Sequence, residues 1–139
     1  MSNTSSWESP SIKVGETYQG MNISANTVAW SGPKYRILDL YNRSVINEND
    51  SYTYSAFVRN TSDTDIEIGF YGVFTDQNGI LITKMKAHTD WTRLSVTFKF
   101  KNLSQRLDTT SIRFEPMYNV TNGYVNQSGF KLEKGTIPT

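Results

Sequence analysis

The sequence predicts an all-β protein built as a two-sheet antiparallel β-sandwich. Short apolar segments alternate with polar residues at a period of two, which is the side-chain repeat of a β-strand. Clusters of turn-forming residues separate these segments, and no segment shows helical periodicity over three turns. Aromatic residues make up 13% of the chain, and Asn, Ser and Thr are frequent, which suits a domain of strands and turns.

The length of the chain favours one domain. A chain of 139 residues can bury about two-thirds of the surface that its unfolded form exposes. The sequence shows no internal repeat and no linker, so residues 1–139 are predicted to form a single domain. The polar residues 1–11 are expected to form a flexible N-terminal arm.

The stretch Tyr52–Phe74 organises the predicted fold. Two alternating segments flank Asn60–Asp65, which is built from residues that form turns with their own backbone. We therefore expect a long antiparallel hairpin with one apolar face. Its other face is mixed and carries Phe57, Arg59 and Tyr71, where a solvated surface would prefer Thr, Lys and Glu.

Other segments supply the remaining strands. Asp76–Gly79 ends in Asn-Gly, a strong reversal signal. Strands are expected at Glu16–Met21, Tyr35–Tyr41, Ile80–Met85, Trp91–Phe100 and Ser111–Tyr118, with short pieces at Tyr124–Val125 and Phe130–Leu132. The apolar faces of these strands predict a core that contains Tyr54, Ile68, Leu94, Val96, Phe98 and Phe114.

The charge and the cysteine count exclude several classes of partner and site. The formal net charge of +1 argues against nucleic acid or an anionic membrane as the main partner, because both select basic surfaces. The chain has no cysteine, so it has no disulfide scaffold and no thiolate zinc site. No apolar run approaches the roughly 20 residues of a membrane span, so membrane insertion is not expected.

The sequence does not indicate an enzyme. It has no glycine-rich phosphate loop, no nucleophile elbow and no cluster with metal-ligand spacing. A glycosidase needs two carboxylates facing one cleft, and Glu115 has no evident partner for this role. His88 is a lone histidine in a turn, so we expect no metal site and no cofactor.

Several motifs occur in an order that resembles the jelly-roll carbohydrate-binding modules. The order is YTYSAFVRN, IEIGFYG, an Asn-Gly turn, DWTRLSVTFKF and a closing FKLEKGTIPT. The closing segment, Lys131–Thr136 followed by Pro138-Thr139, looks most like modules inserted in tail proteins of phages that infect Gram-positive bacteria. The resemblance covers residues Val45 to Thr139, and it depends on the order and spacing of the motifs rather than on any one of them.

The resemblance implies a jelly-roll sandwich, no catalysis, and saccharide binding on the concave sheet or its rim loops. It implies that the module sits in a virion tail or baseplate and binds a cell-surface polysaccharide or oligosaccharide of the host during adsorption. The resemblance also implies that the module is cut from a longer tail protein, whose other domains would be its further partners. Two alternatives stand beside this one: an accessory module of a secreted bacterial glycoside hydrolase, and a purely structural decoration domain of a tail assembly.

The chemistry of sugar binding selects candidate residues. Aromatic rings pack on the C–H patches of sugars, and planar polar groups bond to their hydroxyls. Residues of these types lie on the non-core phase of their predicted strands, or at a rim beside Ser31-Gly32-Pro33. The candidate site is therefore Phe57, Arg59, Tyr71, Arg113 and Glu115 on one sheet face, flanked by Trp30 and Tyr35.

Each candidate also has a structural interpretation. Phe57 and Tyr71 could be buried under a loop, and Trp30 could belong to the core. Arg59, Arg113 and Glu115 could form cross-strand ion pairs, which stabilise a surface little. Trp7 and Trp91 are assigned to structure, because each opens a strand or holds a terminus.

Overall fold

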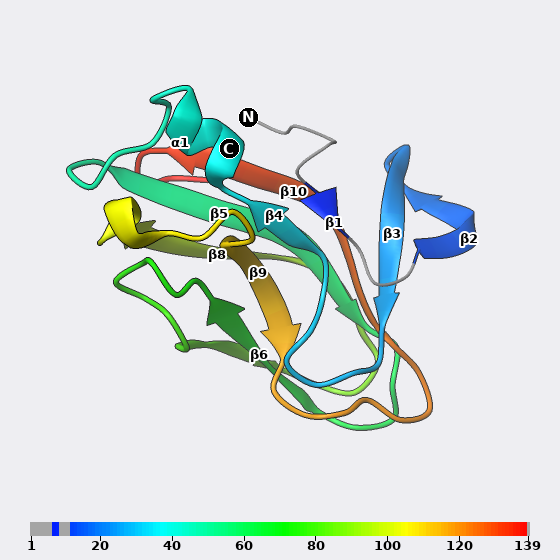
Figure 1. The fold of residues 1–139 in the computed structure, drawn as a ribbon. Coiled ribbons are helices and arrows are strands. Elements are labelled where there is room, and N and C mark those ends of the chain that lie inside the picture. Colours follow the sequence, from blue (N-terminus) through cyan, green and yellow to red (C-terminus); the bar gives the residue numbers. More distant parts are fainter. Residues whose placement is uncertain (1–6, 9–11, 139) are drawn as a thin grey trace.

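The computed structural model describes residues 7–8 and 12–138 and contains two antiparallel sheets (Figure 1). We name each sheet after one of its inner strands. The β9 sheet has the spatial order β1 (Trp7–Glu8), β4 (Lys34–Arg36), β9 (Ser111–Pro116), β6 (Ile66–Tyr71) and β7 (Leu81–Met85). The β5 sheet has the order β2 (Ile12–Tyr18), β3 (Met21–Asn26), β10 (Val125–Lys134), β5 (Ser51–Asn60) and β8 (Thr89–Lys99). The predicted all-β class and two-sheet antiparallel sandwich are confirmed.

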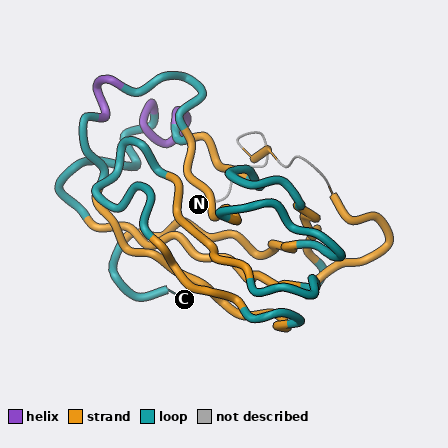
Figure 2. Tube along the Cα trace, turned by 90° about the horizontal axis from the view of Figure 1, so that it is seen from below, coloured by secondary structure: helices purple, strands orange, loops and turns teal. Residues whose placement is uncertain are grey.

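Two short helical segments lie together at one end of the sandwich (Figure 2). They are α1, Leu38–Asn42, and a 3₁₀ turn at Leu103–Gln105. In the described part of the chain, neither has the length and apolarity that crossing a bilayer requires. Trp7 and Glu8 pair with β4; the rest of the predicted N-terminal arm, residues 1–6 and 9–11, lies outside the described residues.

Aromatic rings from both sheets fill the space between them. Tyr54 of the β5 sheet lies 4.8 Å from Phe114 of the β9 sheet, measured between ring centroids. Phe70 of the β9 sheet stacks at 5.3 Å on Phe98 of the β5 sheet. All six residues of the predicted core are buried, namely Tyr54, Ile68, Leu94, Val96, Phe98 and Phe114.

The predicted hairpin within Tyr52–Phe74 is wrong, because β5 and β6 lie in different sheets. β5 pairs with β8 and β10, while β6 pairs with β7 and β9. The apolar faces of β5 and β6 do both point at the core, as their alternation indicates, but they approach it from opposite sides. Residues 60–65 therefore carry the chain from one sheet to the other.

The buried side chain of Asn60 fixes this crossing. Its Nδ2 donates to the carbonyl oxygens of Thr64, at 2.9 Å, and Lys86, at 3.0 Å. Its Oδ1 accepts hydrogen bonds from the backbone N–H and the hydroxyl of Ser62. Since a buried amide left without partners would cost free energy, this network holds the loop in one conformation.

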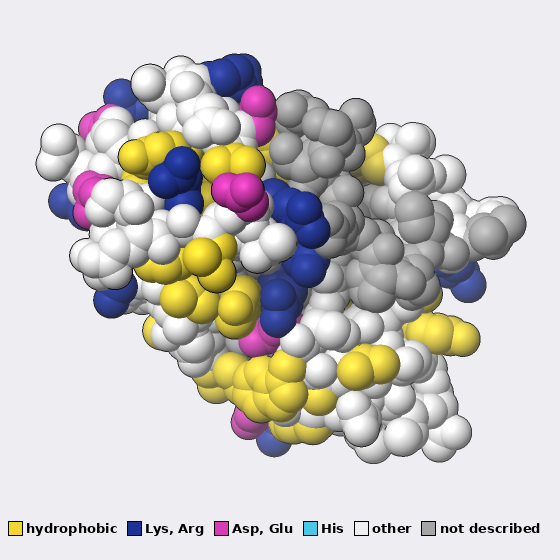
Figure 3. Space-filling view, in the orientation of Figure 1, with side chains coloured by type: hydrophobic (Ala, Val, Ile, Leu, Met, Phe, Trp, Pro, Cys, Tyr) yellow, Lys and Arg dark blue, Asp and Glu magenta, His cyan; other side chains and the backbone are white. Residues whose placement is uncertain are grey.

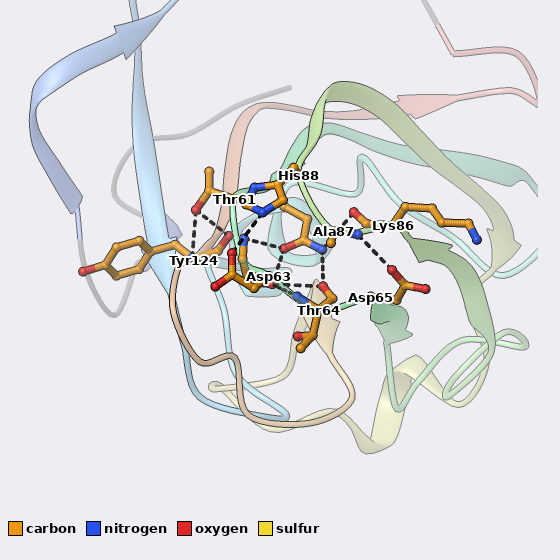
Figure 4. A network of polar contacts seen from close by, with 10 residues as sticks. Thr61, Asp63, Thr64, Asp65, Lys86, Ala87, His88 and Tyr124 are labelled. Carbon is orange, nitrogen blue, oxygen red and sulfur yellow. Dashed lines mark hydrogen bonds and ion pairs between the residues drawn. The ribbon is translucent and has the colours of Figure 1, made fainter.

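Further contacts join the same loop to its neighbours (Figure 4). The three pairs are Thr61 N–H to the Tyr124 carbonyl at 2.9 Å, Asp63 to His88 at 3.0 Å, and Ala87 N–H to the Asp65 carboxylate at 2.9 Å. The loop that connects the two sheets is thus held from both sides.

Two predicted strands have other boundaries in the structure. The segment Tyr35–Tyr41 is not one strand, because β4 ends at Arg36 and α1 follows. The helical turn brings Ile37 and Leu40, three residues apart, to the core together. The expected strand Glu16–Met21 is divided between β2 and β3 by a turn at Gln19-Gly20, where both residues have positive φ.

The Asn-Gly reversal is confirmed as a connection between β6 and β7. These strands pair antiparallel in the β9 sheet. Gly79 has a φ of 83°, in the region that favours glycine, and Asn78 Oδ1 accepts the Gly72 N–H at 2.9 Å.

Truncation of a central ring tests this core. Phe98 is 2% exposed and contacts rings on both sides. Phe98→Ala should lower the free energy of unfolding by about 3–5 kcal/mol, through lost burial and a cavity. Urea unfolding measures this, with Lys99→Ala at the neighbouring exposed position as the control. A loss no larger than that of the control would contradict the assigned core.

Candidate binding site

The outer face of the β5 sheet carries two of the candidate residues. Phe57 and Arg59 lie on the phase of β5 that points away from the core. On the neighbouring strands, Phe57 is opposite Arg93 of β8 and Ser128 of β10, and Arg59 is opposite Asn126 of β10. This face therefore combines a ring with two guanidinium groups and an amide.

The centre of this face is recessed. The residues Thr53, Ser55, Asn126 and Ser128 point outward from β5 and β10, yet each is at most 1% exposed. On the edge strand β8, the outward residues Ser95, Thr97 and Lys99 are exposed. Side chains and flanking segments therefore surround the middle of the sheet and leave its edge open.

The β2–β3 hairpin curls over this face. Tyr18 of β2 stacks on Trp91 of β8, with 4.4 Å between ring centroids, although these strands are at opposite edges of the sheet. In a flat sheet, four strand spacings would separate them by about 19 Å. Tyr18 also meets Phe57 edge-on at 5.2 Å. The outer face of the β5 sheet is therefore concave.

Arg59 holds the curl in place. Its Nε donates to Asn126 Oδ1 at 3.0 Å, and its Nη1 lies 3.1 Å from Glu16 Oε2. Its guanidinium lies 4.7 Å from the ring centre of Trp91. One side chain thus joins β2, β10 and β8, and it contacts the Trp91 ring that Tyr18 also stacks on.

A hollow of about 260 Å³ opens beside Phe57. It is lined by Gln19, Met21, Phe57, Arg93, Gly129, Phe130 and Lys131. The pairing of β10 with β5 is interrupted between Ser128 and Lys131, which is a β-bulge. Gly129 in this bulge has a φ of 65°, and a Cβ there would lie 3.1 Å from the Phe57 ring and 3.2 Å from Met21 Cε. The hollow therefore depends on a glycine.

A second hollow, of about 210 Å³, lies at the C-terminal end of β5. Arg59, Asn60, Thr61, His88, Thr89 and Asp90 line it. Arg59 is two residues from Phe57, so the two hollows are about 7 Å apart along the strand. Together with the rings between them, they form what we call the concave site.

The other candidate residues lie on the outer face of the β9 sheet. Tyr71 is opposite Arg113 across β6 and β9, and Arg113 is two residues before Glu115. The Arg113 guanidinium lies 4.0 Å from the Tyr71 ring, its Nε is 2.9 Å from Glu115 Oε2, and its Nη2 donates to the Trp30 carbonyl at 2.8 Å. Basic and apolar side chains mix on this face (Figure 3).

The expectation that the candidate residues share one sheet face is wrong. Phe57 and Arg59 lie on one side of the sandwich, and Tyr71, Arg113 and Glu115 lie on the other. The alternation identified them correctly as outward-facing, but it could not assign them to a sheet. Ligand binding by the second group stays a prediction, and within this group Arg113 contacts both Tyr71 and Glu115.

Of the two residues predicted to lie at the rim, Trp30 is exposed and Tyr35 is buried. Trp30 is exposed at 57%, and it is held in a left-handed turn with a φ of 59°. Tyr35 is 1% exposed and belongs to the core, so its assignment to the rim is wrong. It is the middle residue of β4, opposite Ile112 of β9, and this pairing turns its ring inward.

Sequence reasoning missed several residues of the concave site. Trp91 was assigned to structure, yet it shares the outward phase of β8 with Arg93, and this phase could have identified it. Tyr18 and Met21 carried no such signal, because only the curl of the hairpin brings them to the site. Trp7 was also assigned to structure; the positions of side chains in β1 lie outside what the structure describes.

The described residues contain no group of three His, Cys, Asp or Glu side chains that could hold a metal ion. On the concave site, Glu16 contacts Arg59, and Glu133 lies 3.8 Å from Arg93. The site therefore offers rings, amides and paired charges, which suits reversible binding of a polar ligand with apolar faces.

Comparison with known proteins identifies the fold. No protein-family model and no curated protein matches the sequence. The xylan-binding domain CBM22-1 of Paenibacillus barcinonensis Xyn10C is similar in structure, with a TM-score of 0.56 and 14% identity over 99% of this chain and 91% of that one. The fold is thus the jelly-roll sandwich that this carbohydrate-binding module also has.

Two larger structures contain similar domains. The tandem CBM22-1–CBM22-2 domain of the same Paenibacillus protein gives a TM-score of 0.56 at 14% identity, covering 99% of this chain and 43% of the tandem. The CBM22-1–GH10 modules of Clostridium thermocellum xylanase 10B, complexed with xylohexaose, give 0.51 at 13% identity, covering 93% of this chain and 25% of that one. The chain spans less than half of either structure.

Glu115 should make stability depend on pH. Burial raises its pKa above the ordinary value of 4.5, and the charge and hydrogen bond of Arg113 oppose this rise. The folded state therefore keeps the proton longer than the unfolded state. The contribution of Glu115 to stability is fully present below the ordinary pKa of 4.5 and is lost as the pH rises through the raised pKa of the folded state.

Glu115→Gln should flatten this dependence, because the glutamine amide does not titrate. Its amide oxygen can still accept a hydrogen bond from Arg113, so the local contact is kept. Urea unfolding between pH 4 and pH 8 (roughly the range in which a raised carboxyl pKa falls) measures the change. Glu67→Gln, on the neighbouring strand, removes one carboxylate elsewhere on the same face and serves as the control. If the free energy of unfolding of Glu115→Gln depends on pH as strongly as that of the unmodified protein, Glu115 is not the source of the pH dependence.

Gly129→Ala tests the bulge. The substitution places a side chain in the left-handed region, at a cost of about 1–2 kcal/mol, and pushes against Phe57 and Met21. Gly79→Ala is a matched control, since Gly79 has a φ of 83° and nothing within 4 Å of the added Cβ. Both variants should lose stability in thermal unfolding, and the Gly129 variant should lose more. Equal losses would show that the bulge tolerates a side chain.

Proposed function

We propose that this protein is a non-catalytic carbohydrate-binding module, and that it holds a saccharide chain in the concave site. The observation that carries the proposal is the ring cluster of Tyr18, Trp91 and Phe57 on a recessed sheet face. Each ring is only partly buried, so part of its surface stays available for the C–H faces of sugars.

Polar groups beside the rings can form hydrogen bonds with the hydroxyl groups of a sugar. Arg59 and Arg93 lie on the same face, are partly exposed, and present planar donors to hydroxyl groups. Arg59 and Asn126 are already bonded to each other, so their side chains are oriented before a ligand arrives. Such preorganisation lowers the entropy cost of binding.

We further propose that the module belongs to a phage tail or baseplate protein, located in the virion, and binds host cell-wall polysaccharide during adsorption. Support comes from the resemblance of Lys131–Thr136 and the preceding motifs to modules of such proteins. Binding of one sugar unit should be weak, in the range of about tens of micromolar to millimolar, because a shallow site recovers little free energy after desolvation. Many copies on one particle would then supply adhesion.

A second candidate function is an accessory module of a secreted bacterial glycoside hydrolase. It is favoured by the similar structures from Paenibacillus and Clostridium, one described as xylan-binding and the other joined to a GH10 module and complexed with xylohexaose. The two candidates differ in the ligand, since the first requires wall polysaccharide and the second a plant polysaccharide.

Titration of the protein with purified Gram-positive wall polysaccharide and, separately, with soluble xylan distinguishes these candidates. Binding to wall material alone supports the tail protein, and binding to xylan alone supports the hydrolase. If neither polysaccharide binds at millimolar sugar (on the order of the weakest affinity expected for a shallow site), the third possibility, a structural decoration domain, replaces both.

Ring substitutions test the location of the site. Phe57→Ala and Trp91→Ala should each weaken saccharide binding by about 1–3 kcal/mol, because each removes an aromatic anchor. Isothermal titration calorimetry with the bound polysaccharide measures the change, and circular dichroism checks that each variant is folded.

The matched control is Tyr71→Ala, which removes a partly exposed ring from the opposite sheet. It should leave the affinity unchanged. If Tyr71→Ala weakens binding while Phe57→Ala and Trp91→Ala do not, the ligand binds to the outer face of the β9 sheet instead.

A further inference from the structure

The hollow beside Phe57 has an unusual charge for a site that binds neutral sugars. Two of its lining residues, Arg93 and Lys131, are basic, and none of the described residues that line it is acidic. Its other walls are apolar or neutral, with Met21, Phe57 and Phe130 around Gly129. A neutral saccharide would need hydrogen-bond acceptors as well as donors, and charged donors favour an anionic partner.

The two cations approach the hollow from both sides of β5. Lys131 of β10 is opposite Ser55 of β5. Arg93 comes from β8, on the other side, and its Nη2 donates to the Ser55 hydroxyl at 3.0 Å. Their strands are two spacings apart, about 10 Å. An acidic group near Ser55 would therefore lie between two positive charges.

The Ser55 hydroxyl and Glu133 hold Arg93 in place, and Glu133 offsets part of its positive charge. Glu133 Oε1 lies 3.8 Å from Arg93 Nη2, a distance longer than a hydrogen bond. The same nitrogen donates the hydrogen bond to the Ser55 hydroxyl. Arg93 and Lys131 line the hollow beside Phe57, and Glu133 lies next to Arg93. Two cations and one carboxylate leave a net positive charge among these three side chains.

We infer that this hollow binds an acidic saccharide, one that carries a carboxylate or phosphate group, with that group between Arg93 and Lys131. The inference rests on the proposed function and names its ligand class. The sugar ring packs on Phe57, and the Arg93 guanidinium offers a planar pair of donors to the acidic group. At about 260 Å³ the hollow is slightly smaller than typical small-molecule pockets, so it holds a short segment of the chain.

A glycan array built of charge-matched pairs tests this inference. Each uronate-bearing glycan stands beside its methyl ester, and each phosphate-bearing glycan beside its dephosphorylated form, so the two arms separate the two sources of negative charge. The whole labelled chain should bind the acidic member about tenfold more tightly at low ionic strength, since two partly exposed cations contribute. The advantage should shrink as sodium chloride is raised, because salt screens the attraction.

Arg93→Gln and Lys131→Gln should each lower the ratio of acidic to neutral glycan binding, because each removes one positive charge from the hollow. Lys84→Gln, which removes an exposed positive charge from β7 of the other sheet, is the matched control and should keep the full preference.

The outcomes separate the inference from the proposed function. Equal binding of acidic and neutral members overturns the inference and leaves saccharide binding intact. A preference that survives both Arg93→Gln and Lys131→Gln overturns the assigned location. The absence of binding to every glycan on the array and to whole cell walls overturns the proposed function itself.

Discussion

The packing of aromatic rings between the two sheets is the constraint on which the rest of the structure depends. Tyr54, Phe70, Phe98 and Phe114 come from both sheets and contact one another across the core. Because successive side chains on a strand point to opposite faces, fixing these rings inward also fixes their neighbours outward. Phe57 and Arg59 face outward for this reason.

A polar network complements the apolar core where the chain passes between sheets. Asn60 ends β5 and is fully buried, and its amide reaches carbonyl groups on both the crossing loop and the segment before β8. The apolar alternation of β5 ends at this residue. The network thus separates β5 from β6 and leaves both flanks of β5 free to pair with β8 and β10.

The concave site arises from contacts that no single strand contains. Arg59 joins three strands, Tyr18 reaches Trp91 across the width of the sheet, and Gly129 opens the hollow at a bulge. On the opposite sheet, Arg113 combines with Tyr71, Glu115 and the Trp30 carbonyl in a compact group. Similar residue types therefore perform different tasks on the two faces: one group lines a recess, and the other ties a loop to its sheet.

The sequence by itself determined the fold class, the core residues and the outward phase of Phe57, Arg59, Tyr71, Arg113 and Glu115. These features follow from local alternation, which every strand carries in its own residues. Only the tertiary structure decided that β5 and β6 belong to different sheets, that Tyr35 is buried, and that Tyr18 and Trp91 meet. Strand pairing uses backbone groups that are the same in every residue, so the side-chain pattern cannot specify a strand's partner or the curvature of its sheet.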